Sequence, residues 1–139
     1  MAKVAEALKL DLVSPERELA ARQVRAVLVP GLEGYFEVRP GHAPVLSILR
    51  PGVLRITEIS GAETKFFVRG GYVEVSGDGM SVLAEYAIPL EELNPQRLEQ
   101  EIRWAEEDLA DARNDEERRK LAERLDFLRH LREALKMDV

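Results

Sequence analysis

The stretch GYFEVRPGHAPVLSILRPGVLRI, residues 34–56, indicates the fold class of this sequence. It holds two segments rich in β-branched and aromatic residues, Gly34–Val38 and the start of Val53–Ile59, and between them the pairs Pro40-Gly41 and Pro51-Gly52. Short apolar segments bounded by proline and glycine predict β-strands that are joined by turns. The stretch therefore predicts a region of several short strands.

The same pattern extends in both directions over residues 1–88. Leu8-Lys9-Leu10-Asp11-Leu12 alternates apolar and polar residues, as does Tyr72-Val73-Glu74-Val75, and this period of two suits a sheet with one buried face. Strands are predicted at Leu8–Val13, Gln23–Val29, Gly34–Val38, Val53–Ile59, Thr64–Arg69, Tyr72–Ser76 and Ser81–Ala84. Turns are predicted at Pro30-Gly31, Pro51-Gly52, Ser60-Gly61, Gly70-Gly71 and Gly77-Asp78-Gly79. Many short strands at this spacing indicate a β-sandwich or a small barrel.

The chain changes character after Pro89, beyond which it has no glycine and one further proline. Asn94 followed by Pro95 predicts a helix start, and Asn114 with the acidic residues after it predicts a break and a second start. Apolar residues recur at helical spacing in two stripes: Leu98, Ile102, Ala105, Leu109 and Ala112, then Leu121, Leu125, Leu128, Leu131 or Arg132, and Leu135. We expect antiparallel helices at about 95–112 and 115–136. The chain is thus predicted to be an α+β protein with a β domain at 1–88 and a helical hairpin domain at 89–139.

Composition excludes several classes of protein. The 139 residues carry a formal net charge of −6, which argues against a nucleic-acid-binding protein. Cysteine is absent, so disulfides, thiolate catalysis and cysteine zinc sites are excluded. No apolar run reaches about 18 residues, so no transmembrane segment is expected. The N-terminus lacks the apolar core of a signal peptide, and we expect the protein to remain in the compartment where it is made.

The charge is concentrated in the predicted hairpin. Residues 89–139 carry 15 acidic and 10 basic side chains, a net charge of −5. A two-helix hairpin is too thin to bury its own apolar stripe well, so the stripe needs another surface. The outer charges are interpreted as solvated helix surface, and an acidic hairpin that docks reversibly remains the alternative.

His42 is the natural candidate for catalysis, because it lies in the stiff segment Pro40-Gly41-His42-Ala43-Pro44. A nucleophilic triad needs a serine or cysteine beside the histidine, and the nearby Ser47 is not in a G-x-S-x-G motif. A zinc site would need more histidine or cysteine than the chain offers. His42 is therefore interpreted as a turn or interface residue.

Other candidate chemistry is equally weak. Glu33, Glu37, Glu58, Glu63, Glu74 and Glu85 are scattered over the β domain, and no spacing singles out a pair for acid–base catalysis. Neither G-x-x-x-x-G-K-[ST] nor G-x-G-x-x-G occurs. Trp104 and Phe127 fall on predicted helices and are interpreted as packing residues. The residues alone indicate a binding or assembly module, with no cofactor and no metal.

The order of these features resembles a known family. LDLVSPERELA at 10–20, VLVPGLEGYFEVRPGHAPVLSILRPGVLRI at 27–56 and FFVRGGYVEVSGDGMSVLAEYAI at 66–88 precede the predicted hairpin. This order resembles the epsilon subunit of bacterial F-type ATP synthase over nearly the whole chain. Pro40-Gly41-His42-Ala43-Pro44, with Gly31, Gly34 and Gly52 around it, is highly specific to that family.

The resemblance implies an N-terminal flattened β-sandwich of about ten strands, followed by a C-terminal antiparallel two-helix hairpin. It implies a rotor subunit without catalytic residues, bound to the gamma subunit and to the c-ring, and transiently to the catalytic alpha and beta subunits. The expected place is the cytoplasmic face of the bacterial inner membrane, as a peripheral protein. In some members the hairpin extends along gamma and blocks ATP hydrolysis. The partner contacts implied here are Glu33, Tyr35 and His42.

The sequence departs from the family at two places. Many members have an acidic residue after the Glu-Gly pair of the first long loop, where this chain has Tyr35. Some bacterial members bind ATP through the motif I/L-D-x-x-R-A, and the matching stretch here is Leu93-Asn94-Pro95-Gln96-Arg97-Leu98. Asn94 replaces the aspartate and Leu98 the alanine, so Arg97 remains as a weak candidate for nucleotide binding.

Three functional hypotheses follow. The preferred one is a non-catalytic rotor subunit, the second is an ATP-sensing regulatory module whose hairpin closes on nucleotide, and the third is a small enzyme that uses the scattered carboxylates. Copurification with gamma and a stripped ATPase core separates the first from the other two.

Overall fold

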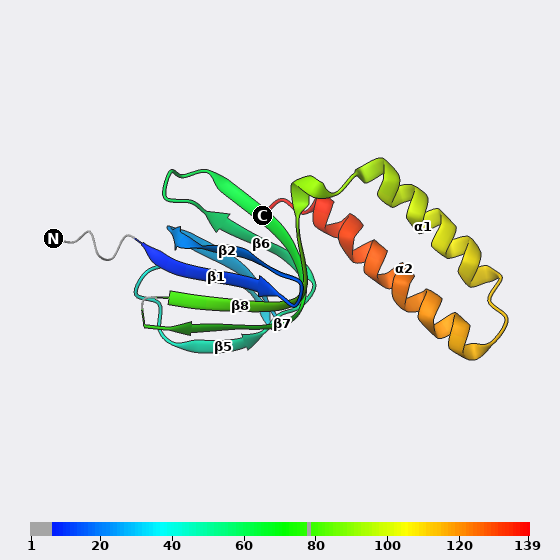
Figure 1. Ribbon diagram of the computed structural model, residues 1–139, viewed down its shortest axis with the longest axis horizontal. Coiled ribbons are helices and arrows are strands. Elements are labelled where there is room, and N and C mark those ends of the chain that lie inside the picture. Colours follow the sequence, from blue (N-terminus) through cyan, green and yellow to red (C-terminus); the bar gives the residue numbers. More distant parts are fainter. Residues whose placement is uncertain (1–6, 78) are drawn as a thin grey trace. The chain divides into compact units, whose positions relative to one another are not determined.

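The computed structural model describes residues 7–77 and 79–139 and divides the chain into two compact units. The first unit runs to Pro89, and the second is Leu90–Asp138. The first is built of strands and the second of helices (Figure 1).

The described part of the first unit forms one eight-stranded sheet that folds over on itself. The strand order is β2-β1-β8-β7-β6-β3-β4, and β5 pairs with β7 beside this path. Neighbouring strands are antiparallel except for β1 and β8, which run parallel. The bounds are β1 Leu8–Ser14, β2 Arg17–Val24, β3 Ala26–Gly31, β4 Gly34–Val38, β5 Val45–Ile48, β6 Gly52–Thr57, β7 Glu63–Ser76 and β8 Gly79–Pro89.

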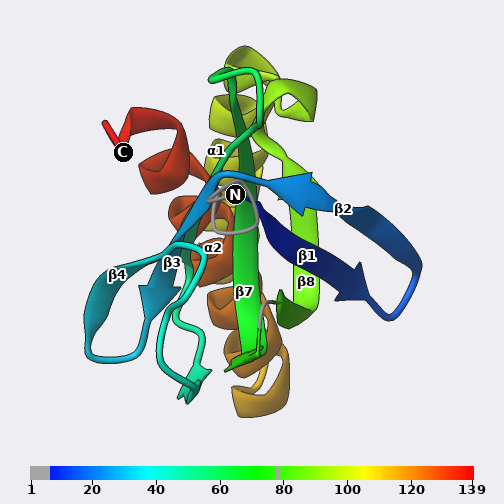
Figure 2. The same ribbon diagram turned by 90° about the vertical axis from the view of Figure 1, so that its left-hand side faces the viewer.

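The two long strands β7 and β8 belong to both halves of the folded sheet. The first part of β7 pairs with β6 and with the end of β8, and its second part pairs with β5 and with the start of β8. Figure 2 shows β3 and β4 on one side of β7, and β1, β2 and β8 on the other. If each long strand is counted as two segments, the eight strands become ten. The predicted β-sandwich of about ten strands is confirmed.

The core lies between the two halves of the sheet and is apolar. Leu10, Leu12, Val27, Leu54 and Val73 are fully buried in it, and none of the described residues buries a polar or charged side chain. Along β1 and along the second part of β7, buried residues alternate with more exposed ones, as the period of two predicts.

Several strand predictions need correction. Two strands, β2 and β5, were not predicted, and Gln23–Val29 is interrupted at Arg25 between β2 and β3. Pro30-Gly31 ends β3 instead of forming the turn, which falls on the next two residues. Gly70-Gly71 bends β7 without ending it, because both glycines have positive φ, +73° and +94°, while the pairing with β8 continues on either side. The predicted turn at Gly77-Asp78-Gly79 includes Asp78, which lies outside the described residues.

The second unit is an antiparallel pair of helices, α1 Pro95–Ala110 and α2 Asp115–Lys136, after the short 3₁₀ turn η2 Leu90–Glu92. Both predicted starts are confirmed: Asn94 Oδ1 accepts from Arg97 N at 2.9 Å, and Asn114 Oδ1 accepts from Glu117 N at 2.8 Å. Such caps satisfy N–H groups that have no partner within the helix. Leu98, Ile102, Ala105, Leu125, Leu128, Leu131 and Ala134 are buried, whereas the predicted stripe members Leu109, Ala112, Leu121 and Leu135 are half-buried.

Ion pairs join the two helices. Arg124 meets Glu101 at 3.1 Å, Arg129 meets Glu106 at 3.2 Å and Arg132 meets Glu99 at 3.3 Å. Each arginine comes from α2 and each glutamate from α1. The pairs are at least partly exposed, so each contributes little stability.

A polar cluster joins β2 to the β6–β7 hairpin. Arg22 donates to both carboxylate oxygens of Glu58, at 3.0 and 2.7 Å, and Thr64 donates to the same carboxylate at 2.7 Å. The hydrogen bonds from Arg22, assisted by those from Thr64 and by the arginine's charge, hold the pKa of Glu58 below its ordinary value of 4.5. The depressed pKa means that the folded state favours the ionised carboxylate.

We expect Glu58→Gln to lower the free energy of unfolding by about 1 kcal/mol at pH 7, because the charge-assisted fork to Arg22 is lost. Since the folded pKa is depressed, the contribution of Glu58 is present above pH 4.5 and is lost as the pH falls through the lower folded value. Urea unfolding of both proteins over this range measures the effect. The two stability curves should converge in acid, and a constant difference down to pH 2 would contradict the assignment.

Candidate partner-contact site

The segment around His42 is a type II β-turn. The Arg39 carbonyl accepts from the His42 backbone N–H at 3.0 Å, and Gly41 has φ +87°. Proline at the second position and glycine with positive φ at the third are the residues that this turn requires. The sequence at 39–42 therefore sets the backbone of this loop, and proline stiffens it.

The His42 ring is held within its own loop. Nδ1 lies 2.7 Å from the Ala43 carbonyl oxygen, and since a carbonyl can only accept, this nitrogen carries the proton. The ring also lies against Phe36, with 6.3 Å between the ring centroids. His42 is half-buried, while Gly41, Ala43 and Pro44 around it are exposed. The residue thus serves the turn, and the loop's exposed surface comes from its neighbours.

Tyr35 has an internal role in addition to its exposed one. Its ring is on β4 and is 37% exposed, but its hydroxyl accepts from the Val53 backbone N–H at 3.0 Å. A side chain at Gly52 would meet this hydroxyl, because a Cβ there would lie 2.8 Å from the Tyr35 oxygen. Tyr35 therefore ties the β4 edge strand to β6, a role that the sequence did not indicate.

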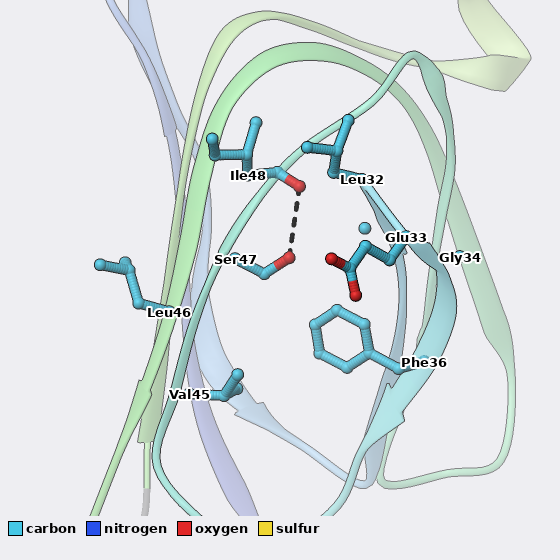
Figure 3. A pocket seen from close by; sticks show the side chains of 9 residues that line it. Leu32, Glu33, Gly34, Phe36, Val45, Leu46, Ser47 and Ile48 are labelled. Carbon is cyan, nitrogen blue, oxygen red and sulfur yellow. Dashed lines mark hydrogen bonds between the residues drawn. The ribbon is translucent and has the colours of Figure 1, made fainter.

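Glu33 lies on the turn between β3 and β4 and is exposed. It lines a hollow of about 420 Å³ together with residues of β5. Figure 3 shows Leu32, Glu33, Gly34 and Phe36 on one wall and Val45, Leu46, Ser47 and Ile48 on the other. Apart from Glu33 and Ser47 the hollow is lined by apolar side chains and glycine, so it holds no pair of titratable groups for acid–base chemistry.

Two of the three predicted contact residues, Glu33 and His42, lie on the same side of β4, and Tyr35 points to the other side. Phe36 connects the Glu33 hollow to His42, since it lines the first and packs on the second. Tyr35 is the next residue along β4 from Phe36, so its side chain points to the opposite face of the strand. Leu32, Leu46 and Ile48 beside the hollow are also exposed, and the sequence pattern did not single them out.

The start of α1 holds the residues that match the ATP-binding motif. The Asn94 side chain caps the helix, and Leu98 is only 6% exposed. Arg97 Nε lies 3.3 Å from Glu101, and the Arg97 guanidinium lies 5.7 Å from the centre of the Trp104 ring. The interpretation of Trp104 as a packing residue is wrong: its ring is 47% exposed and carries this cation–π contact.

The scattered carboxylates fall into two groups. Glu37, Glu58 and Glu63 are in ion pairs with arginines. Glu33, Glu74 and Glu85 are exposed and have no ion pair among the described residues. In the part of the chain that the structure describes, no cluster of three or more histidine or acidic side chains could hold a metal ion. None of the helices among residues 7–77 and 79–139 has the length and hydropathy needed to cross a membrane.

Comparison with known proteins identifies close relatives of both units. Residues 7–90 match the family model for "ATP synthase, Delta/Epsilon chain, beta-sandwich domain". The "ATP synthase epsilon chain" of Parvibaculum lavamentivorans is 46% identical and covers 93% of this chain and 98% of its own. That of Mesorhizobium japonicum is 39% identical over 95% of this chain and 98% of its own.

Two solved structures have a similar fold. A chain of the Euglena gracilis mitochondrial ATP synthase structure, described as OSCP/F1/c-ring, aligns with a TM-score of 0.76 at 21% identity and covers 94% of this chain and 80% of its own. A chain of the Tetrahymena thermophila mitochondrial ATP synthase structure, described as central stalk/c-ring, aligns with a TM-score of 0.62 at 17% identity, over 92% of this chain and 96% of its own. At these identities the likeness concerns the fold.

Proposed function

This chain belongs to the ATP synthase epsilon chain family, and from this we propose that it is a non-catalytic subunit of the rotating central stalk. In this role it couples the gamma subunit to the c-ring of the membrane sector. The observation that carries the proposal is the 46% identity to an ATP synthase epsilon chain over 93% of the sequence, which includes both the sandwich and the hairpin. The chains of similar fold come from F1/c-ring and central stalk/c-ring assemblies, which supports these partners.

The residues that could have served in catalysis are engaged in contacts within the protein, which supports a subunit without catalysis. His42 is engaged in its turn, and Glu37, Glu58 and Glu63 are in ion pairs with arginines. A peripheral position on the cytoplasmic face of the bacterial inner membrane follows from the role, because the partners place the subunit there. No sequence motif assigns chemistry to the remaining carboxylates, which leaves the enzyme hypothesis without a motif.

The experiment that tests the proposal is copurification. A tagged copy of the full chain, expressed in its host, should bring down the gamma subunit and a stripped ATPase core from solubilised membranes. Recovery of the chain alone, or with unrelated proteins, would overturn the proposal.

Within this role we propose a division of labour between a sandwich domain at 1–88 and a hairpin domain at 89–139. The sandwich carries the rotor contacts, and the hairpin reaches the catalytic alpha and beta subunits transiently and inhibits ATP hydrolysis. The separate compactness of the two units supports this division. Hydrolysis by the reconstituted complex with the full chain, compared with a chain that ends at residue 88, tests the inhibition: equal rates would contradict it.

We expect Glu33→Lys to weaken assembly or coupling without unfolding the subunit. Glu33 is exposed on the turn between β3 and β4, so reversing its charge alters the surface and leaves the core intact. A reversed charge at an interface typically costs several-fold in affinity or more, on the order of tenfold at a central position. Glu16→Lys, on the exposed turn between β1 and β2, is the matched control.

Assembly is measured by copurification of gamma and c-ring subunits, and coupling by proton pumping in membrane vesicles. The Glu16 variant should behave as the wild type does. Normal assembly and pumping with Glu33→Lys would remove this residue from the contact site.

A further inference from the structure

The end of the β3–β4 hairpin projects beyond the strand pairing that holds its base. β3 pairs with β6 from Ala26 to Leu28, while its pairing with β4 continues to Gly31. Pro30 lies in the part of β3 that β6 does not pair, and proline has no backbone N–H to donate to a neighbouring strand. The turn that carries Glu33 therefore lies at an end of the hairpin that needs other attachments.

Two backbone hydrogen bonds attach this end of the hairpin to β5 and to the residues that follow it. The Leu32 N–H donates to the Ile48 carbonyl oxygen at 2.9 Å, and the Arg50 N–H donates to the Pro30 carbonyl oxygen at 3.0 Å. Figure 3 shows Leu32 and Ile48 on the walls of the hollow beside Glu33. Neither bond reaches β6, which is the strand beside β3 in the sheet.

The Tyr35 side chain supplies a link to β6. Tyr35 is the partner of Pro30 in the β3–β4 pairing, and its hydroxyl accepts from the Val53 N–H of β6 at 3.0 Å. The pairing of β3 with β6 ends before it reaches Val53, so the hydroxyl takes the place of a ladder acceptor. Val53 is 0% exposed, so loss of the hydroxyl would leave its N–H without this acceptor in a buried position.

The residues around the Tyr35 hydroxyl leave room for it. A Cβ at Gly52 would lie 2.8 Å from the hydroxyl oxygen and 2.9 Å from Pro30 Cβ. The hydroxyl is the far end of a side chain, so a methyl group at Gly52 would push it away from Val53. The missing donor of Pro30, the missing side chain of Gly52 and the reach of Tyr35 thus belong to one local arrangement.

We propose that Tyr35 is a positioning residue: by holding β4 to β6 through Val53, its hydroxyl fixes the place of the turn at residues 32–34, which carries Glu33. The inference rests on the proposed function, under which this turn contacts a partner in the rotor. A contact turn that is already ordered binds more tightly, because a loose loop loses affinity when binding has to order it.

Native-state hydrogen exchange on the full-length chain tests this role. The Leu32 and Arg50 amides report on the attachment of the turn, because both are hydrogen-bonded there. In Tyr35→Phe, the local opening that exposes these two amides should become about tenfold more frequent. Tyr72→Phe is the matched control, because Tyr72 is 41% exposed and its hydroxyl has no hydrogen-bond partner within residues 7–77 and 79–139. Its exchange should stay within about twofold of the wild type.

Low concentrations of urea separate a local opening from a loss of overall stability. Local openings respond weakly to urea, whereas global unfolding, which exposes the amides of β1, responds strongly. If Tyr35→Phe speeds exchange only in β1 and leaves the local opening at Leu32 and Arg50 unchanged, the proposal is overturned. Gly52→Ala should displace the hydroxyl and loosen the same two amides, so the result does not depend on a single variant.

Copurification separates this inference from the function that it rests on. A tagged Tyr35→Phe chain should recover at least about threefold less of the gamma and c-ring subunits than the wild type, although the aromatic ring and Glu33 are retained. Wild-type recovery in spite of a loosened turn would overturn the positioning role and leave the rotor function intact. If the wild type recovers neither partner, the rotor function fails, and hydrogen exchange still decides whether Tyr35 holds the turn.

Discussion

Gly71→Ala is expected to lower the free energy of unfolding by about 3 kcal/mol or more, a large part of the 5–15 kcal/mol typical of a whole domain. Gly71 has φ +94°, which strains any side chain, and a Cβ there would overlap the Leu83 carbonyl oxygen and lie 2.8 Å from the Leu83 carbonyl carbon. Both atoms belong to the backbone of β8, so a side-chain rotation cannot relieve the overlap. The bend that lets β7 serve both halves of the sheet therefore requires glycine at this position.

The chain contains a matched control for this substitution. Gly61 has nearly the same φ, +96°, but a Cβ there would have nothing within 4 Å. Gly61→Ala should therefore cost only the conformational strain, about 1–2 kcal/mol. Urea unfolding followed by circular dichroism measures both variants, and the difference between them isolates the steric overlap. Equal losses would show that β8 moves aside freely and that the bend is not fixed by this contact.

The full-length chain is expected to bind ATP weakly or not at all, in contrast to the ATP-sensing members that it resembles. Asn94 lacks the charge of the aspartate in the motif, and its side-chain oxygen is engaged with the Arg97 backbone N–H at 2.9 Å. The loss of one charge-assisted hydrogen bond costs about 1.5–3 kcal/mol, roughly tenfold to a hundredfold in affinity. Leu98, buried at 6% exposure, adds bulk where alanine is usual.

The cation that remains in the motif, Arg97, already has an acidic partner. The Arg97 guanidinium contacts the Glu101 carboxylate and the Trp104 ring, so a phosphate would compete with that carboxylate for its charge. Calorimetric titration of ATP decides the question, and a dissociation constant in the low micromolar range would favour the sensor hypothesis instead. The double variant Asn94→Asp, Leu98→Ala, which restores the motif at both positions, is titrated with ATP in parallel. Aspartate also caps helices well, so α1 is retained, and a gain in affinity would show that these two positions are what suppress binding.

The helix starts were predictable, because residues close together in the sequence determine them. The helices begin where an asparagine can cap them, at Asn94 and Asn114, because capping depends only on residues three positions apart. The strand β2 was missed because it lies at an edge of the sheet, and its sequence RELAARQV has exposed polar residues at most positions, so no clear alternation results. The strand β5 was missed because it is four residues long and follows two prolines closely.

The candidate site was predictable in part. The turn at His42 follows from proline and glycine. The hydrogen bond from the Val53 N–H to the Tyr35 hydroxyl could not be predicted, because it depends on the pairing of β4 and β6 with β3. Trp104 could have been placed correctly, because it lies one residue before the stripe member Ala105 and so points about 100° away from it.

The parallel pairing of β1 with β8 has a consequence for the order in which the chain folds during its synthesis. Lys9 is aligned with Gly79 and Val13 with Leu83, so partners on adjacent strands are 70 residues apart in the chain. Until the ribosome has released both strands, β1 can pair only with the nearby β2, and the loop that closes the sheet carries a large entropy cost. The sandwich is thus completed late, just before the helical segment emerges. The hairpin, whose contacts are local, forms rapidly afterwards, so a nascent chain arrested before residue 79 would expose an open, unpaired strand edge.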